Sequence, residues 1–548
     1  MRRILAVVLT FLFSATFAFS QNAAGSSYWL KLKDKKGTNY QISHPEAFLS
    51  KRSINRRVKQ HIPIDETDLP VSSVYLDSLR KCGLEILHSS KWLNGVTVRT
   101  PDTALIRQTG KLTFVSEIQL TKPAAALKSG VIKFNEEETI AAFDETKYGI
   151  ALAQLTQLNG RYLHDRGIRG KGIQIAVLDA GFWHVNGIEA FDSLRNSNRI
   201  MGTHDFVDPK SDFYHQHTHG MSVLSCMGGN LPGTMIGTAP DASYYLFRSE
   251  DSSTEYLIEE DNWVAAAELA DSLGVDVINS SLGYSEFDDP RMDHLYSDMN
   301  GKKSRVTQGA NMAFQKGILV FSSAGNEGKE TWKYIIAPSD GENVIAVAAV
   351  DKDGIRASFS SVGPAFGGAI KPNVAATGSS TFLVTSFGQL GYSSGTSFSS
   401  PVLAGMGACL LQSNPWATVK QVKMAIEQSG CQYSNPDSLL GYGIPDFAKA
   451  DIYLKVNGNK ALKTDAEWQV SPNPFNNRLF IQNLNPLSDD NCQISIYNLQ
   501  GICLLQSTFK TSGSIFLTDL ANLPVGILFL SIRCGIKEER IKLIKTVR

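Results

Sequence analysis

Cysteine is scarce in this chain, with seven residues among 548. The seven are widely spaced, and none forms a Cys-x-x-Cys pair, the usual spacing of a cysteine-bound metal cluster. A cluster of that kind is therefore not expected. Cys226 and Cys409 lie in apolar runs and are interpreted as buried thiols. Cys492, Cys503 and Cys534 could form a disulfide, but the sequence does not decide which of them pair.

An excess of positive charge is also missing. The 53 Lys and Arg residues balance 53 Asp and Glu residues, so the formal net charge is zero. A protein that binds nucleic acid or an anionic membrane through its overall field needs a basic surplus. We therefore expect no nucleic-acid partner.

Long hydrophobic runs are absent except for one at the start of the chain. Two arginines precede an apolar run from Ile4 to Phe19, which is interrupted by Ser and Thr. A membrane span needs about 20 apolar residues, and this run is shorter. Small residues occupy the two positions that a signal peptidase inspects. Residues 1–20 are therefore predicted to be a secretory signal that is cleaved before Gln21, leaving a soluble or surface-held protein.

Residues 28–120 are expected to form a small α+β unit. A basic segment at 51–57 is interpreted as a solvated face. Residues 121–147 lack apolar periodicity and are predicted to be an exposed linker. A small unit, a cleavable linker and an enzyme-like body are together the layout of a zymogen. The predicted elements of the small unit are two alternating strands, at 28–33 and 95–99, and an amphipathic helix at 74–80.

The body of the chain starts near Tyr148 and alternates apolar strands with helices. The first strand runs through 171–179 and ends on an aspartate. Continuous apolar strands fit a sheet that is covered on both faces, and strands alternating with helices predict an α/β fold with a doubly wound, mostly parallel sheet. Further strands are expected at 275–279, 318–321 and 344–350, and helices at 219–227, 263–273 and 306–316.

After about Tyr453 the sequence changes to short alternating segments separated by turn residues, which predict a small β-sandwich. Its expected strands lie at 478–481, 493–497, 514–517 and 527–532. The predicted domains are thus the signal peptide at 1–20, the N-terminal unit with its linker at 21–147, the α/β body at 148–455, and the β-sandwich at 456–548.

A serine in the body lies where chemistry is favourable. Gly395-Thr396-Ser397 precedes Pro401 and a long apolar run, an order that predicts a loop, a serine and then a buried helix with proline in its first turn. Backbone N–H groups and the positive end of the helix dipole would then lie near the serine oxygen. Taken alone, such a tripeptide is more often an ordinary turn.

A nucleophilic serine needs a base, a group that orients the base, and donors for the developing oxyanion. The chain offers His219 as the base, Asp179 as the orienting group and Asn326 as the donor, each at the boundary of a predicted element. Singly, Asp179 and Asn326 could be turn residues, and the imidazoles of His215, His217 and His219 could bind a metal. The order Asp, His, Asn, Ser favours a serine hydrolase.

From about residue 148 to 450 the chain resembles the subtilisin family of serine endopeptidases. Ala180, Met221 and Ser222 replace the family's usual Thr, Thr and His, and none of these changes removes a proton-handling group. The segments that carry the resemblance are Val177–Gly181, His219–Val223, Gly237–Pro240, Ile278–Gly283 and Gly395–Pro401.

The resemblance implies roles for named residues. Asp179, His219 and Ser397 would be the catalytic triad, and Asn326 would line the oxyanion hole. The remaining assignment is a substrate-binding segment that pairs with the peptide backbone as an added strand, made of Ser281, Leu282 and Gly283.

The segment 284–307 is longer than in compact bacterial members of the family. Its acidic residues could rim the cleft or hold Ca²⁺, but a solvated loop is favoured because no EF-hand spacing is present. No metal ligands are assigned and no cofactor is expected to be required, although structural calcium stays open. The acidic residues are Asp288, Asp289, Asp293 and Asp298.

By position and layout, residues 28–120 resemble the family's inhibitory propeptide. The tail resembles the C-terminal sorting domain of the type IX secretion system, although Ile527 stands where that domain often has Tyr; a general adhesive β-sandwich is the alternative. The segments of the tail that match are Ser471–Phe475, Ile496–Gly501 and Leu523–Gly526.

These resemblances imply a secreted or cell-surface serine endopeptidase, made as a zymogen and exported through the periplasm of a Gram-negative bacterium. Its expected partners are protein or peptide substrates, its own propeptide and the type IX machinery. Two alternatives stay open: an inactive relative that acts as a binding protein, and a peptide ligase or cyclase. Substrate preference, the activation cut and the fate of the C-terminal domain are not fixed by the sequence.

Overall fold

The computed structural model describes residues 25–125, 133–134, 138–140, 148–462, 468–483, 491–510, 514–534 and 537–546. The expected secretory signal at 1–20 lies outside the described residues, as does most of the expected linker. The chain divides into two compact units, Met1–Leu454 and Lys455–Arg548, which are described separately below. Within the described ranges, no helix has both the length and the apolar character that crossing a bilayer requires.

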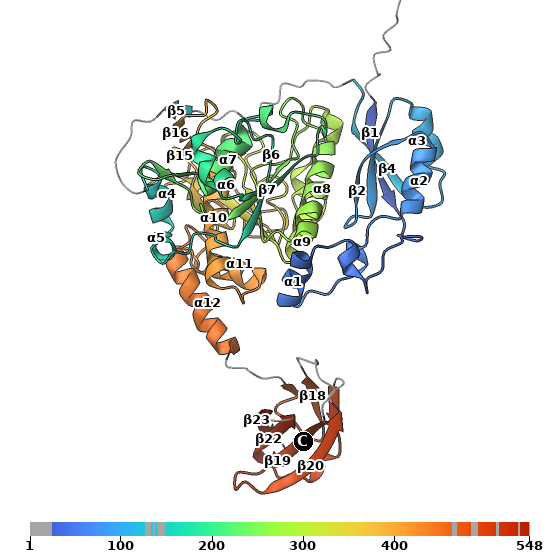
Figure 1. The fold of residues 1–548 in the computed structure, drawn as a ribbon, viewed down its shortest axis with the longest axis vertical. Coiled ribbons are helices and arrows are strands. Elements are labelled where there is room, and N and C mark those ends of the chain that lie inside the picture. Colours follow the sequence, from blue (N-terminus) through green and yellow to red (C-terminus); the bar gives the residue numbers. More distant parts are fainter. Residues whose placement is uncertain are drawn as a thin grey trace, which may run out of the picture. The chain divides into compact units, whose positions relative to one another are not determined.

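The N-terminal part of the first unit is a four-stranded antiparallel sheet with two helices packed on one face. Leu30, Leu79, Val96 and Val98 are fully buried between the sheet and these helices. The other face of the sheet lies against a helix of the α/β body, α8 (Figure 1). In spatial order the strands are β2 (Glu85–Ser90), β3 (Gly95–Thr100), β1 (Ser26–Leu32) and β4 (Val115–Lys122); the helices are α2 (Ser73–Lys81) and α3 (Thr103–Thr109).

The body of the first unit is built on a seven-stranded parallel sheet, which confirms the expected α/β class. Its central strands are continuous apolar runs because helices cover both faces, and β13 is buried at every residue. The spatial order is β14 (Val374–Thr377), β13 (Ile345–Val350), β12 (Leu319–Ser323), β11 (Val277–Ser280), β6 (Gln174–Asp179), β10 (Ser243–Arg248) and β7 (Ile200–Asp205).

Two pairs of helices cover the sheet, one pair on each face (Figure 1). Helix α7 packs on α10, and α8 packs on α9. The helices expected at 219–227 and 306–316 are present, and the helix expected at 263–273 begins five residues earlier. The bounds are α7 (His219–Gly228), α8 (Ile258–Leu273), α9 (Arg305–Gln315) and α10 (Thr396–Ser413).

The second unit contains two antiparallel sheets that enclose one apolar core, as expected for a β-sandwich. One sheet has the order β17 (Trp468–Ser471), β18 (Leu479–Asn483), β21 (Ser514–Leu517). The other has the order β20 (Cys503–Lys510), β19 (Asn491–Tyr497), β22 (Gly526–Cys534), β23 (Lys537–Lys545). Strands β17, β20 and β23 were not expected from the sequence.

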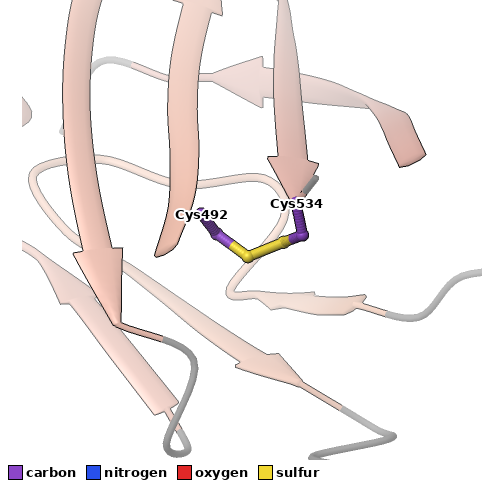
Figure 2. The surroundings of a disulfide bond; sticks show 2 residues. All are labelled: Cys492 and Cys534. Carbon is purple, nitrogen blue, oxygen red and sulfur yellow. A yellow bond between two sulfur atoms is a disulfide. The ribbon is translucent and has the colours of Figure 1, made fainter. Parts of the chain in front are cut away.

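One disulfide joins the two central strands of the larger sheet. Cys492 and Cys534 are paired residues of β19 and β22, with their Cα atoms 4.4 Å apart (Figure 2). Cys503 is exposed and free. The thiols of Cys226 and Cys409 are buried in the first unit, as expected from their apolar surroundings.

The basic segment at 51–57 is not a solvated face, so that interpretation was wrong. It lies in helix α1 (Lys51–Lys59), and the side chains of Arg56 and Arg57 are buried against α8. Both guanidinium groups bond to the carboxylate of Asp271, and the Lys91 ammonium lies 3.1 Å from the same group. A buried carboxylate needs such partners, and these cations hold the pKa of Asp271 below its usual value despite its burial. These ion pairs therefore hold the N-terminal part against α8.

His88 lies on the same interface, and its burial predicts how the stability of the docked N-terminal part depends on pH. The Nε2–H group of His88 donates to the Phe206 carbonyl over 3.0 Å, and burial lowers the pKa of His88 to about 4. The His88 ring is neutral in the docked state and has a pKa of about 6.5 in the unfolded chain. Its contribution to the free energy of unfolding is therefore complete above pH 6.5 and is lost as the pH falls toward 4. The loss should be on the order of 2 kcal/mol, since one pKa unit corresponds to about 1.4 kcal/mol and the ring is not fully buried.

The measurement is urea unfolding of the uncut chain, carrying Ser397→Ala, between pH 7 and pH 4. Stability should fall more steeply in this chain than in one that also carries His88→Gln, because glutamine can still donate to the carbonyl but does not titrate. Parallel curves for the two proteins would contradict the prediction.

Candidate active site

Asp179 and His219 meet at the carboxyl end of the sheet. Asp179 is the last residue of β6, and His219 is the first residue of α7. The Nδ1 atom of His219 lies 2.6 Å from Oδ1 of Asp179, and both side chains are buried. A Cβ atom on Gly220 would lie 2.7 Å from the Asp179 Cβ, so only glycine after the histidine lets the helix come this close to the strand. The structure therefore brings this predicted pair together.

Ser397 lies in the first turn of α10 and is 5% exposed. It lines a cavity of about 140 Å³ together with Asn326 and Phe134. The Phe134 ring centroid lies 4.3 Å from that of His219, and the ring of Phe398 lies 6.0 Å from it. The serine and the asparagine therefore border one cavity, at a helix N-terminus that favours negative charge, and the His219 imidazole packs on Phe134, another residue of the cavity lining.

The helix that carries Ser397 starts earlier than expected. Pro401 lies in the interior of α10, not at its start. A residue at that position would normally donate its N–H to the carbonyl four residues before it, which belongs to Ser397, and proline cannot. The Oγ atom of Ser281 donates to that carbonyl instead, over 2.8 Å. Ser281 thereby connects the predicted substrate-binding segment to the serine turn.

The amide of Asn326 is held by its oxygen. Its Oδ1 atom accepts hydrogen bonds from the N–H and Oγ1 groups of Thr396, each at 2.9 Å. This leaves the amide nitrogen as the donor that can serve a ligand in the cavity. The turn that places Asn326 begins at Gly325, whose φ of +110° lies in the region that favours glycine.

The predicted substrate-binding residues follow strand β11 and line the same cavity. Ser281 and Leu282 are buried, and a Cβ atom on Gly283 would lie 2.1 Å from the Ile336 side chain. Ser281, Leu282 and Gly283 thus line the same cavity as Asn326.

The three histidines considered as a metal cluster have separate partners. The Nδ1 atom of His215 lies 2.8 Å from Oδ2 of Asp212, and Nδ1 of His217 accepts from the backbone N–H of His219. The Nδ1 atom of His219 faces Asp179. In the part of the chain that the structure describes, the one group of three potential metal ligands within 4.8 Å of one another is Glu250, Glu255 and Glu259.

The segment 284–307 was expected to be a solvated acidic loop. That expectation was wrong for its first half. Asp288 and Asp289 are buried, at 6% and 3% exposure. Asp288 accepts from the backbone N–H of Glu255, and Asp289 caps a short helical turn. Asp293 and Asp298 also accept backbone N–H groups. These carboxylates shape the loop by bonding to backbone.

Two residues of the expected linker lie inside the cavity, which sequence reasoning did not predict. Lys133 and Phe134 line it, and the Phe134 ring packs on the His219 ring. Farther along, β5 (Glu138–Ile140) pairs with β16 (Leu390–Ser393), and the Glu138 carboxylate accepts from the N–H of Ser386. Neither segment has apolar periodicity, so no signal of a packed element was available at these positions.

Family models match three parts of the chain. Residues 170–443 match the subtilase family, 27–137 match the peptidase S8 propeptide domain of Bacteroidota, and 469–546 match the secretion system C-terminal sorting domain. The three matches correspond to the expected body, propeptide and tail.

Named relatives match more than half of the chain. A thermostable alkaline protease of Halalkalibacterium halodurans is 29% identical over 58% of this chain and 76% of its own length. Subtilisin NAT of Bacillus subtilis subsp. natto and subtilisin E of Bacillus subtilis are each 28% identical over 57% of this chain and 76% of their own length.

Proposed function

Because this chain belongs to the subtilase family of serine endopeptidases, we propose that it hydrolyses peptide bonds through Asp179, His219 and Ser397 and is made as a zymogen. The observation that carries the proposal is the 2.6 Å contact between His219 Nδ1 and Asp179, beside the cavity that Ser397 and Asn326 line. The matched propeptide domain at 27–137 supports the zymogen.

In the proposed reaction, the Asp179 carboxylate holds the Nδ1–H group of His219, so that Nε2 is the nitrogen that acts as the base. Nε2 takes the proton of Ser397 Oγ as that oxygen attacks the scissile carbonyl. The negative oxygen that forms accepts from the Asn326 amide. His219 then gives its proton to the leaving amine, and water hydrolyses the acyl-enzyme by the same route. The backbone of Ser281, Leu282 and Gly283 would pair with the substrate as an added strand.

The propeptide and sorting-domain matches indicate a secreted or cell-surface protein of Bacteroidota. We propose that residues 1–20 direct export to the periplasm of a Gram-negative cell and are removed there. Residues 21–147 would contain the intramolecular inhibitor and the linker in which activation cuts, 148–455 would be the protease, and 456–548 would be the domain that the type IX machinery recognises. The mechanism requires no cofactor. Structural calcium remains possible, and it is not assigned to the cluster of three glutamates, which holds the Lys133 ammonium in this form.

The proposal is tested on the exported wild-type protein with a fluorophosphonate probe. We expect covalent labelling at Ser397, mapped by mass spectrometry, together with hydrolysis of casein to peptides. An inactive binding protein would remain unlabelled, and a ligase or cyclase would be labelled but would release joined or cyclic products. Either result would overturn hydrolysis as the function.

A further inference from the structure

We propose that Glu250, Glu255 and Glu259 form a pocket that binds a lysine or arginine side chain of the peptide substrate. The inference rests on the proposed protease function and names the class of peptide that it prefers.

The pocket already holds such a side chain. The Lys133 ammonium lies 2.9 Å from Glu255 Oε2 and 2.8 Å from Glu259 Oε2, and it also bonds to Glu250. It donates to the Asp251 carbonyl over 2.9 Å as well. The Lys133 side chain is only 6% exposed. A lysine that comes from outside the catalytic body is thus almost fully enclosed by acceptors of that body.

The acceptors are fixed in place by the catalytic body itself. Glu250 and Glu255 lie between β10 and α8, Glu259 lies in the first turn of α8, and each is at most 6% exposed. The Tyr284 hydroxyl donates to Glu250 over 2.9 Å, and the backbone N–H of Asp251 donates to Glu259 over 3.1 Å. The pocket therefore does not need Lys133 to shape it.

Three buried carboxylates so close together require a cation. Burial and mutual repulsion raise the pKa of Glu255 to about 8 and raise that of Glu259, while the carboxylates raise the pKa of the Lys133 ammonium. A second lysine of the N-terminal part, Lys122, lies 3.1 Å from Asp251 on the same loop. Both lysines lie within the matched propeptide, at 27–137, so activation removes them. With Lys133 gone, these carboxylates must take up protons or another cation, and a basic side chain of a substrate supplies that cation.

The pocket opens on the reaction site. Lys133 and Glu255 line the cavity that contains Ser397, and the neighbouring Phe134 packs on His219. A peptide that follows the path of these two residues places a basic side chain among the glutamates and the next residue on the imidazole. Lys133 thus marks where the basic residue of a substrate would lie.

The test compares two quenched fluorescent peptides that copy residues 129–142, one with lysine at position 133 and one with norleucine there. The exported, processed wild-type protein should show a kcat/KM at least about 30-fold higher for the lysine peptide, the lower end of what losing one partner of a buried charge pair costs. In Glu255→Gln and Glu259→Gln the ratio should fall to about 3-fold or less. Glu342→Gln, at an exposed site, is the matched control and should keep the wild-type ratio.

Failure of this inference is distinguishable from failure of the proposed function. Equal kcat/KM for the two peptides in a wild-type protein that hydrolyses both and is labelled by fluorophosphonate would overturn the pocket alone. Competition of the uncleaved peptides in a fluorescence anisotropy assay needs no turnover, so equal affinity there would overturn the pocket even without hydrolysis. Fluorophosphonate labelling of each variant confirms that it folds. A lysine preference that calcium abolishes and EGTA restores would assign the glutamates to a metal and also overturn the proposal.

Discussion

Replacing Ser397 by alanine is expected to lower kcat by about 10⁶-fold, the scale seen when a serine protease loses its nucleophile. Without Oγ no acyl-enzyme can form, and only charge stabilisation and binding remain, worth about 10³–10⁴ over the reaction in water. The small side chain leaves the helix start unchanged, so the variant should fold. Ser413→Ala, at the other end of α10, is the matched control and should retain activity.

The intact mass of the Ser397→Ala variant also shows whether the chain cuts itself during maturation. It should remain uncut, whereas the wild-type protein should acquire a new N-terminus within residues 135–138. The cut is expected there because Phe134 packs on His219 while Glu138 is paired beyond the cleft with β16. Peptide hydrolysis by Ser397→Ala at a tenth of the wild-type rate or more would remove this serine from the mechanism.

Asp179→Asn is expected to lower kcat by about 10⁴-fold while leaving the shape of the site intact. An asparagine amide can turn its NH₂ group toward His219, which then presents the wrong tautomer to the serine, and the imidazolium that forms is no longer stabilised by a buried carboxylate. Steady-state kinetics on a single peptide measures the loss.

The chain provides its own control for that substitution. Asp212 and His215 form a carboxylate–imidazole pair with the same chemistry, 2.8 Å apart but exposed to solvent. Asp212→Asn should change kcat less than 2-fold, because exposed pairs contribute little. A loss of less than about 10-fold in Asp179→Asn would show that this carboxylate does not orient the base.

The sequence predicted the elements whose patterns are local. Strands β6, β11, β12 and β13 are continuous apolar runs, and such runs can be recognised without knowing what covers them. Strand β7 was missed because it lies at the edge of the sheet and exposes half of its residues. Strand β14 is as short as β11, but two of its four residues are alanines, which are depleted in strands and give a weak signal.

Motifs in the sequence identified the predicted site residues. The contacts that hold these and other residues in place come from partners far away in the sequence, which motifs do not show. Arg56 looked like a surface residue because its partner, Asp271, lies 215 residues away in the sequence. The role of Ser281 at the Ser397 carbonyl follows from Pro401 being inside the helix, which spacing did not predict. Lys133 and Phe134 showed no pattern because they are held by a cleft that the rest of the chain builds.

The catalytic body holds the linker on both sides of the expected activation cut. Lys133 is held by the glutamates, Glu138 is held next to β16, and the N-terminal part is tied to α8 through Asp271. None of these contacts depends on the chain being continuous. Breaking one peptide bond therefore leaves the imidazole covered, and the delay before foreign proteins are digested is governed by how long the severed fragment stays attached.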